Sequence, residues 1–229
     1  MKNILLIGGS HGIGRSIVTE LQDTAALFVA SRTDESLSHK NVTYIEFDAT
    51  KDDLDISLLP EKLDGFVYCP GNINLKPFKM MGLETMKEDM ELNFFAMVKV
   101  VQEIISKMDE GSSMVFFSTI AVSTGMPFHT SVSAAKGAIE GFAKSMAAEY
   151  APKIRINVIA PSLVDTPLAK CLLNNDKKRE AMDERHPLKR VGTADDIAQS
   201  AVFLLSDKSS WITGQVIGVD GGLSTLNIN

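Results

Sequence analysis

The sequence predicts an α/β fold built on one doubly wound, parallel sheet of about seven strands. Short apolar runs alternate with segments whose apolar residues recur at helical spacing, the order expected when helices cross between parallel strands. A glycine-rich turn joins the first apolar run to the first helical segment. Because the chain has 229 residues and no linker or repeat, we expect a single domain over residues 1–229.

The expected elements follow in chain order from these patterns. The predicted strands are short buried-type runs at 4–7, 26–30, 42–47, 65–69, 114–117, 155–161 and 215–219. The interval 34–41 leaves little room for a helix between the second and third strands. Long helices are expected at 84–107 and 131–150, and another is expected to start after Thr193, which is spaced from Asp196 as in a capping box.

The turn after the first strand is the strongest functional signal. Gly8, Gly12 and Gly14 surround Ser10, His11 and Ile13, and a helix follows. Glycine permits positive φ and lets an anion approach backbone N–H groups, while a helix N-terminus carries partial positive charge. The turn therefore predicts a dinucleotide site.

The end of the second strand indicates which dinucleotide is bound. An acidic residue at this point usually contacts the ribose 2′-hydroxyl of NAD, whereas a basic residue accommodates the 2′-phosphate of NADP. Here the positions hold Ser31 and Arg32, and His11 could add a second donor. We therefore expect NADPH to be preferred over NADH; in the alternative interpretation, Arg32 is a solvated loop residue.

Several motifs together resemble the short-chain dehydrogenase/reductase family over nearly the whole chain. They are the Gly-x-x-x-Gly-x-Gly turn, the Ser-Ala-Ala-Lys-Gly-Ala run at 133–138, Arg-Ile-Asn at 155–157 and Asp-Gly-Gly at 220–222. The resemblance implies a Rossmann fold and further cofactor contacts at Asp48, Ala49, Pro70, Gly71, Lys136, Pro161, Val164 and Thr166. Among these, the resemblance implies that Asp48 touches the adenine and Thr166 holds the nicotinamide amide.

The resemblance also exposes departures from the family's pattern. Before Gly71 the chain lacks the usual Asn-Asn-Ala, and Ser162 replaces the glycine of the family's Pro-Gly-x-x-x-Thr turn. Family members reduce carbonyls with a Tyr-x-x-x-Lys pair, but here Val132 takes the tyrosine position four residues before Lys136. Valine cannot give a proton to the oxygen that gains charge when hydride arrives.

Other catalytic positions are kept or altered conservatively. Thr119 stands where the family has its serine, with Ser118 beside it. Asn93, in the context Glu-Leu-Asn, matches the asparagine with which the family holds a water near the lysine. The resemblance therefore implies that Asn93, Thr119 and Lys136 belong to the catalytic centre.

Three interpretations are consistent with the absence of the tyrosine. In the first, His129 is the acid, because residues 129, 132 and 136 would share a helical face and histidine titrates near neutrality; a loop histidine can also be a plain surface residue. In the second, a water held by Lys136, Asn93 and Thr119 gives the proton. In the third, the chain is a cofactor-binding structural or regulatory subunit without reductase activity. The substrate stays open among 3-oxoacyl thioesters, ketones and enones.

The composition limits which partners and which cellular compartment we expect for the protein. A net charge of −6 and a pI near 5.3 argue against a nucleic-acid surface. No run is long enough to span a bilayer and no leader is seen, so we expect a cytoplasmic protein. Cys69 and Cys171 are too far apart in the sequence to suggest a metal motif.

Two further expectations concern surfaces. Residues 167–190 are longer than a plain connection and fit a substrate lid. A stripe of small residues follows one side of the helix at 131–150, namely Ala134, Ala138, Gly141, Ser145 and Ala148. We expect a homodimer or homotetramer that forms through this helix and the one at 84–107; in the alternative, an internal neighbour covers the stripe.

Overall fold

The computed structural model describes residues 1–35 and 37–227 and confirms the predicted fold class. Seven parallel strands form one sheet in the order β3-β2-β1-β4-β5-β6-β9. The strands are β1 Lys2–Ile7, β2 Ala25–Ser31, β3 Val42–Glu46, β4 Leu63–Tyr68, β5 Met108–Phe117, β6 Ile154–Pro161 and β9 Val216–Val219. A separate two-residue ladder joins β7 Val164–Asp165 to β8 Gly192–Thr193.

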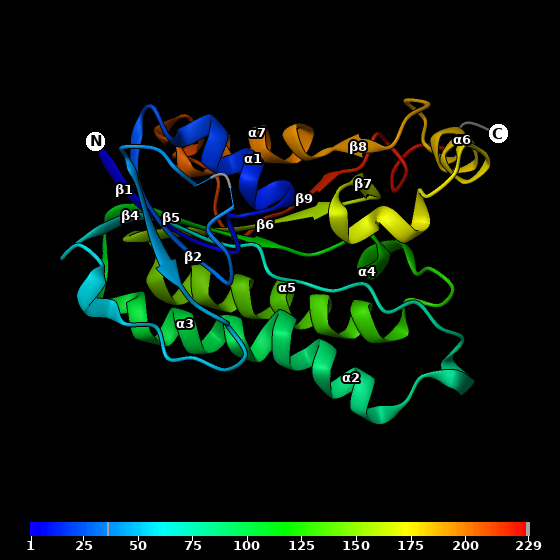
Figure 1. Ribbon diagram of the computed structural model, residues 1–229, viewed down its shortest axis with the longest axis horizontal. Helices are drawn as coiled ribbons and strands as arrows, with labels where there is room; N and C mark the ends of the chain where they lie inside the picture. Colours follow the sequence, from blue (N-terminus) through cyan, green and yellow to red (C-terminus); the bar gives the residue numbers. More distant parts are fainter. Residues whose placement is uncertain (36, 228–229) are drawn as a thin grey trace.

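Helices cover both faces of this sheet (Figure 1). On one side lie α1 Gly12–Leu21 and α7 Ala194–Leu205, and on the other lie α2 Leu83–Met90, α3 Ala96–Ile104 and α5 Thr130–Tyr150. The side chains of β1 alternate between the two resulting cores: Leu5 and Ile7 join one, Ile4 and Leu6 the other. Both faces of the central strands are therefore buried, which explains why their sequences are continuous apolar runs.

The expected helices occur, with one local change. The predicted helix at 84–107 is α2 and α3 joined by a π-helical turn at Glu91–Phe95. No helix lies between β2 and β3 in the described residues there, as expected. The capping box that starts α7 is formed by Thr193 and Asp196. Two short helices that the patterns did not indicate are α4 Ala121–Thr124 and α6 Asp176–Arg185.

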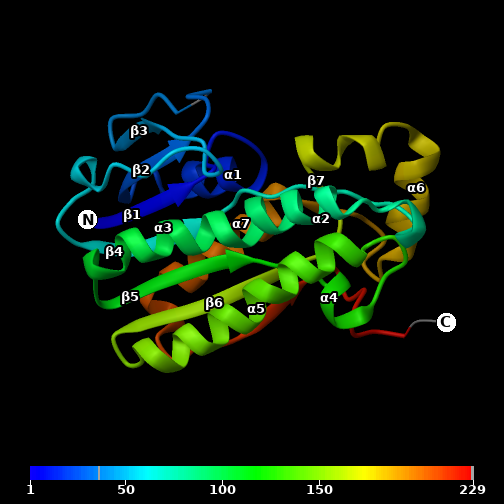
Figure 2. The ribbon, with the colours of Figure 1, turned by 90° about the horizontal axis from the view of Figure 1, so that it is seen from below.

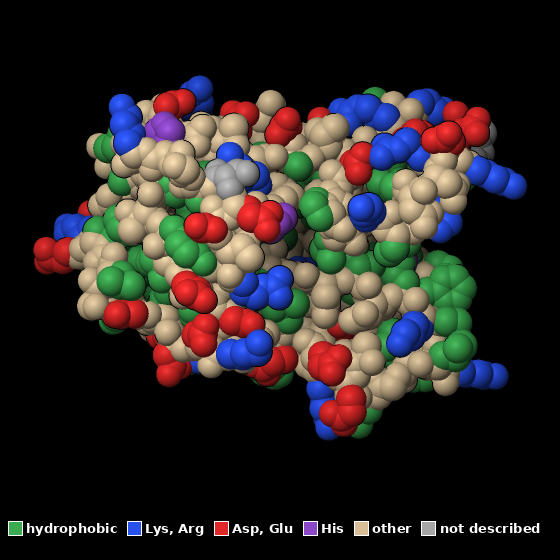
Figure 3. Space-filling model, in the orientation of Figure 1, with side chains coloured by type: hydrophobic (Ala, Val, Ile, Leu, Met, Phe, Trp, Pro, Cys, Tyr) green, Lys and Arg blue, Asp and Glu red, His purple; other side chains and the backbone are tan. Residues whose placement is uncertain are grey.

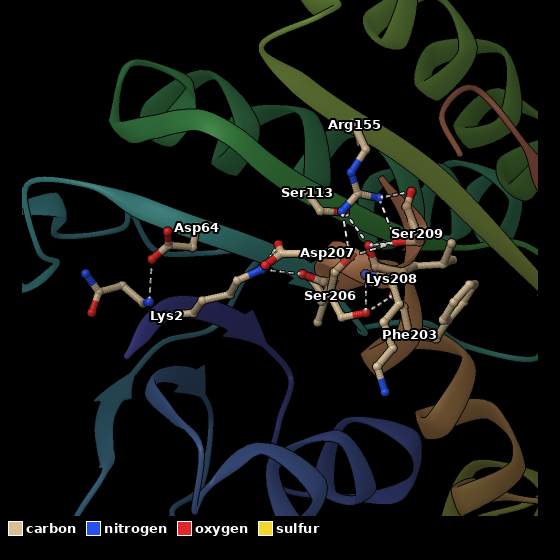
Figure 4. Close-up of polar contacts among 12 residues, drawn as sticks. Lys2, Asp64, Ser113, Arg155, Phe203, Ser206, Asp207, Lys208 and Ser209 are labelled. Carbon is tan, nitrogen blue, oxygen red and sulfur yellow. Dashed lines mark hydrogen bonds and ion pairs between the residues drawn. The ribbon is translucent and has the colours of Figure 1, made fainter. Parts of the chain in front are cut away.

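The two ends of the sheet differ in what they carry. At the carboxyl ends of the strands, the turn at 8–12, the loop after β4, the N-terminus of α5 and the segment with α6 come together (Figures 1 and 2). At the opposite end, Arg155 of β6 and Lys2 of β1 meet the C-terminus of α7 (Figure 4). Within the part of the chain that the structure describes, no helix is long and apolar enough to cross a membrane.

Candidate active site

The glycine turn forms a cradle open to an anion. Gly8 and Gly12 have φ of +81° and +53°. A Cβ on Gly14 would lie 2.2 Å from the backbone oxygen of Gly8, so only glycine fits there. No side chain caps the N-terminus of α1, and its first N–H groups have no intrahelical acceptor. These features fit the pyrophosphate of a dinucleotide.

Beside this cradle lie the residues expected to choose the nucleotide. Arg32 is exposed, and no hydrogen bond or ion pair engages it among the described residues. The His11 ring lies 2.9 Å from Ser10 Oγ through Nδ1 and 3.0 Å from Glu35 Oε2 through Nε2. Ser31 Oγ donates to the Thr33 carbonyl at 2.8 Å. The sequence patterns did not predict the contact with Glu35. Because its carboxylate is hydrogen-bonded to Nε2 of His11, that nitrogen is not free to bind the 2′-phosphate in this structure.

At the end of β3, Asp48 is held by its own turn. Its Oδ1 accepts from Thr50 Oγ1 at 2.8 Å and from Thr50 N at 3.1 Å, and Lys51 Nζ lies 3.1 Å from Oδ2. The hydrogen bond from the Thr50 side chain is the main reason why the pKa of Asp48 is lowered. Ala49 beside it is buried.

A cleft of about 280 Å³ opens next to the cradle. Most of its wall is apolar, and Figure 3 shows this face hollowed between the part that carries α6 and the part that carries α2. Nine of the predicted site residues line it: Ile13, Gly71, Ser118, Thr119, His129, Lys136, Pro161, Val164 and Thr166. Asn93 and most of the predicted residues around the ends of β1, β2 and β3 lie outside it. Pro70 also lies outside it and contacts the cradle where a Gly8 side chain would begin.

Lys136 is the chemically most unusual group of the cleft wall. It lies on α5, is only 9% exposed and has Val132 one turn before it. Burial lowers the pKa of Lys136 to about 8. The nearby Cys69 is partly buried, and desolvation raises the pKa of its thiol to about 12, so it supplies no counter-charge near neutral pH.

Gly71 leaves a space between Lys136 and Asn93. A Cβ built on Gly71 would lie 3.1 Å from Asn93 Oδ1 and 3.4 Å from Lys136 Nζ. Asn93 is fully buried in the π-helical turn, and its Oδ1 has no hydrogen-bond partner among the described residues. An orphaned buried oxygen and a buried ammonium thus lie on the same side of Gly71.

Comparison with known proteins decides the family of this site. The family model described as enoyl-(acyl carrier protein) reductase matches residues 8–224. The 3-oxoacyl-[acyl-carrier-protein] reductase FabG of Chlamydia trachomatis is 31% identical over 243 aligned positions, which cover 97% of each chain. The chain belongs to the short-chain dehydrogenase/reductase family.

Other members of this oxidoreductase family are similar over comparable lengths. L-xylulose reductase of Bos taurus is 31% identical, with 96% of each chain covered. The crystal structure of a short chain dehydrogenase family protein from Francisella tularensis is 28% identical and superposes with a TM-score of 0.91, covering 99% of this chain and 100% of that one. The seven-stranded Rossmann-like sheet is thus shared with other short-chain dehydrogenase/reductases.

The remaining predicted catalytic residues of this short-chain dehydrogenase/reductase lie at different places around the cleft. His129 stands half-buried at the N-cap of α5, because the helix begins at Thr130. Its Nδ1 lies 2.7 Å from the Pro127 carbonyl, so Nδ1 carries the proton and Nε2 is left as the free nitrogen. Ser118 Oγ donates a hydrogen bond to Glu140 Oε1 of α5 at 2.5 Å, so its proton is not available to a substrate. Thr119, in contrast, lines the cleft.

Two polar groupings escaped the sequence reasoning. Ser162 Oγ lies 2.8 Å from Nε2 of His186, whose Nδ1 donates to the Met182 carbonyl, so the turn after β6 is joined to the end of α6. Fully buried Asp89 binds side chains from the loop after β4 and from α5. No local signal in the sequence marked Asp89, because a carboxylate within an amphipathic helix is usually solvated.

Proposed function

We propose that this short-chain dehydrogenase/reductase is an NADPH-dependent reductase of carbonyl or enoyl substrates, in which Val132 stands in place of the usual tyrosine. The observation that carries the proposal is the approach of Asn93 Oδ1 and Lys136 Nζ to the same side of Gly71, where a Cβ would lie 3.1 Å from the first and 3.4 Å from the second. Nucleotide binding alone would account for Lys136, which can hold the nicotinamide ribose, but it does not account for the unpaired buried oxygen of Asn93 beside it, which costs folding free energy.

The cofactor contacts follow from the residues that form the cradle. Backbone N–H groups at the start of α1 would hold the pyrophosphate, and the turn at Pro161, Val164 and Thr166 would hold the nicotinamide end. That turn lies close to the cradle, since a Cβ on Gly12 would contact Thr166 at 3.5 Å. When bound, NADPH supplies hydride for the reduction.

Arg32 and Glu35 supply the test of cofactor choice. Arg32 has the free charge that a 2′-phosphate needs, whereas Glu35 opposes it and pairs with His11. We expect Arg32→Ala to weaken NADPH at least tenfold more than NADH, and Glu35→Gln to tighten NADPH by about threefold. Fluorescence titration with both nucleotides measures this, and equal changes for NADPH and NADH would contradict the assignment of Arg32.

Lys136 supplies the proton in this proposal, through a water that Asn93 Oδ1 helps to hold. A water between Lys136 Nζ and Asn93 Oδ1 hands a proton to the substrate oxygen, Lys136 restores it, and the Thr119 hydroxyl donates a hydrogen bond to the same oxygen. His129 fits this role less well, because the Pro127 carbonyl holds its Nδ1 proton and the neutral ring has no proton on Nε2 to give. His129→Ala is therefore expected to keep turnover within about twofold, whereas a loss of a hundredfold or more would assign the proton to His129.

The cleft wall favours substrates with an apolar part. Ile73, Leu75, Met126, Leu168 and Leu172 line it, and the last two belong to the segment 167–190 that we propose as a lid. The similar proteins named above include reductases of a 3-oxoacyl thioester and of a sugar ketone by their names. Of these, the apolar wall favours an acyl or ketone substrate over a sugar.

The deciding experiment combines binding and turnover. NADPH affinity is first measured by fluorescence, and NADPH oxidation is then followed against 3-oxoacyl thioesters, ketones and enones. Binding with turnover of one class supports the proposal. Tight binding without turnover of any class supports the alternative, a structural or regulatory subunit, and failure to bind either nucleotide contradicts both.

We also propose that the chain acts as a single cytoplasmic domain and assembles with copies of itself. Four of the five stripe residues on α5, Ala134, Gly141, Ser145 and Ala148, are exposed, so no internal neighbour covers them. Sedimentation at micromolar concentration tests the assembly: a monomer would contradict it, and charged substitutions at Ala148 should dissociate a dimer or tetramer.

A further inference from the structure

The carboxylate of Asp89 is completely buried and is bound from three directions. Its Oδ1 accepts from Asn72 Nδ2 at 2.7 Å and from Asn74 Nδ2 at 2.6 Å, and its Oδ2 accepts from Ser131 Oγ. The donors come from the loop after β4 and from the first turn of α5. Asp89 therefore ties α2 to both elements that border the space at Gly71.

The position of Asp89 also suits its charge. Ser131 lies in the first turn of α5, where N–H groups give partial positive charge and where no acidic residue of α5 itself stands. Asp89 provides that negative charge from a neighbouring helix. The N-terminus of α5, which carries Val132 and Lys136, is thereby held against α2.

A directional chain of hydrogen bonds runs from Asp89 to the cleft. A carboxylate only accepts, so Asn72 must turn its NH₂ toward Asp89 and its Oδ1 away. That Oδ1 accepts from Asn93 Nδ2 at 2.8 Å, and the same NH₂ donates to the Asp89 carbonyl at 2.8 Å. With its NH₂ committed twice, Asn93 can only present Oδ1 to the space beside Lys136.

We infer that Asp89 is a positioning residue which, through Asn72, fixes the Asn93 amide with its oxygen toward Lys136. This inference rests on the proposed function for its catalytic meaning, but the orientation of Asn93 is a property of the free protein. Without the carboxylate, the two amides lose their direction and Asn93 can turn its NH₂ toward the ammonium. An N–H group there disfavours the charged form of Lys136, whereas an oxygen favours it.

The test follows the Lys136 ammonium by NMR in protein labelled with ¹³C-lysine, without cofactor, with Lys136→Met for assignment. Asp89→Asn is expected to shift the proton equilibrium of Lys136 about tenfold toward the neutral amine. Asn93→Ala should shift it in the same direction, and the double variant should move no further than Asn93→Ala alone. The swap Asp89→Asn with Asn72→Asp restores an acceptor-only group next to Asn93 and should restore the titration.

A matched control comes from the other end of the sheet. Ser113 is equally buried and donates one hydrogen bond, at 2.8 Å to the Leu204 carbonyl, so Ser113→Ala should leave the Lys136 titration unchanged. An unchanged titration in Asp89→Asn, additive shifts in the double variant, or a swap that does not restore the equilibrium would each overturn the inference. None of these results depends on turnover, so a protein that binds no nucleotide would refute the proposed function and leave this test intact.

In an active enzyme, the same variants separate positioning from packing. Asp89→Asn is expected to lower kcat about tenfold with KM for NADPH unchanged, because the cradle at 8–14 lies on other elements. The pH at which kcat is half-maximal should move in step with the Lys136 titration. A rise in the KM for NADPH with kcat preserved would contradict the assigned role.

Discussion

The two ends of the sheet use similar polar groups for opposite purposes. At the amino end, Arg155 donates to the Ser209 carbonyl at 3.0 Å, to Ser209 Oγ at 2.8 Å and to the Ser206 carbonyl at 3.1 Å (Figure 4). At the carboxyl end, Lys136 is buried without a counter-charge and Asn93 Oδ1 has no partner in the described residues. The cation of the amino end is thus hydrogen-bonded three times, although Ser112 Oγ nearby has no partner in the described residues, whereas the cation of the carboxyl end lies on a cleft wall with no hydrogen bond to it shown.

The difference comes from what each end has to satisfy. The C-terminus of α7 presents carbonyls that no further turn can satisfy, and Ser113, Ser209 and Lys2 donate to those of Leu204 and Leu205. Two cations, Lys2 and Arg155, also oppose the negative end of this helix. The amino end therefore stabilises the fold, while the carboxyl end keeps unpaired groups whose cost is accepted at functional sites.

Lys136→Met gives the largest expected effect and directly tests the role of the carboxyl end of the sheet. Loss of the ammonium should lower kcat about a thousandfold, in the range that proton transfer contributes to catalysis. The fold should persist, because methionine fills the same volume without a buried charge. Steady-state NADPH oxidation and circular dichroism measure the two quantities. A variant that retained half of the activity would exclude Lys136 from the chemistry.

The pH dependence of stability sharpens the same contrast. The pKa of Lys136 is about 8 in the folded protein, below its ordinary value of 10.5, so between these values the unfolded chain binds a proton that the folded one does not. Stability contributed by this group therefore rises from pH 8 to pH 10.5, by about 3 kcal/mol at most. Urea unfolding of wild type and Lys136→Met should differ in slope over this interval. Parallel curves would show that the lysine is not buried in solution.

Arg155→Met tests the structural role of the amino end of the sheet. Removing three hydrogen bonds from a charged donor should cost about 2 kcal/mol and lower Tm by about 6 °C. NADPH affinity and kcat should stay within about twofold, since the cofactor cradle lies at the opposite edge of the sheet. Calorimetry and nucleotide titration measure the two effects. A large loss of turnover with unchanged Tm would reverse the functions assigned to the two ends.

The sequence predicted the fold well because local signals agreed with one another. Apolar runs placed all seven strands, and Thr193 with Asp196 placed the start of α7, since each signal lies within a few consecutive residues. The glycine turn was found for the same reason. Such features need no knowledge of which distant segments meet.

The parts of the site that depend on distant segments were not predictable. The pairing of Glu35 with His11 and of Ser162 with His186 joins residues 24 positions apart in each case. Asp89 is joined to Ser131 across 42 positions, and nothing local distinguishes it from a solvated helix residue. Ser118 was expected beside the substrate, but its hydroxyl donates a hydrogen bond to Glu140 of α5. Only tertiary contact reveals these partners.

Gly71→Ala is the smallest and most local change, and it tests the space between the open groups. Gly71 is not in the left-handed region, so alanine is tolerated by the backbone. Its Cβ would stand 3.1 Å from Asn93 Oδ1 and 3.4 Å from Lys136 Nζ, so these two groups must move slightly apart, and none of the atoms nearest to it belongs to the cradle. We expect kcat to fall about tenfold, with NADPH affinity unchanged and stability altered by less than about 1 kcal/mol.

Gly137→Ala is the matched control, because it adds the same methyl group next to Lys136 in the sequence but on another side of α5. Its Cβ meets only Val122 Cγ1, at 3.6 Å, an ordinary packing distance, and alanine favours the helix. This variant should keep full turnover and gain up to about 1 kcal/mol of stability. If Gly71→Ala behaved like Gly137→Ala, the proton of Lys136 would not reach the substrate through a water beside Asn93. The contrast between the two ends would then be one of stability alone.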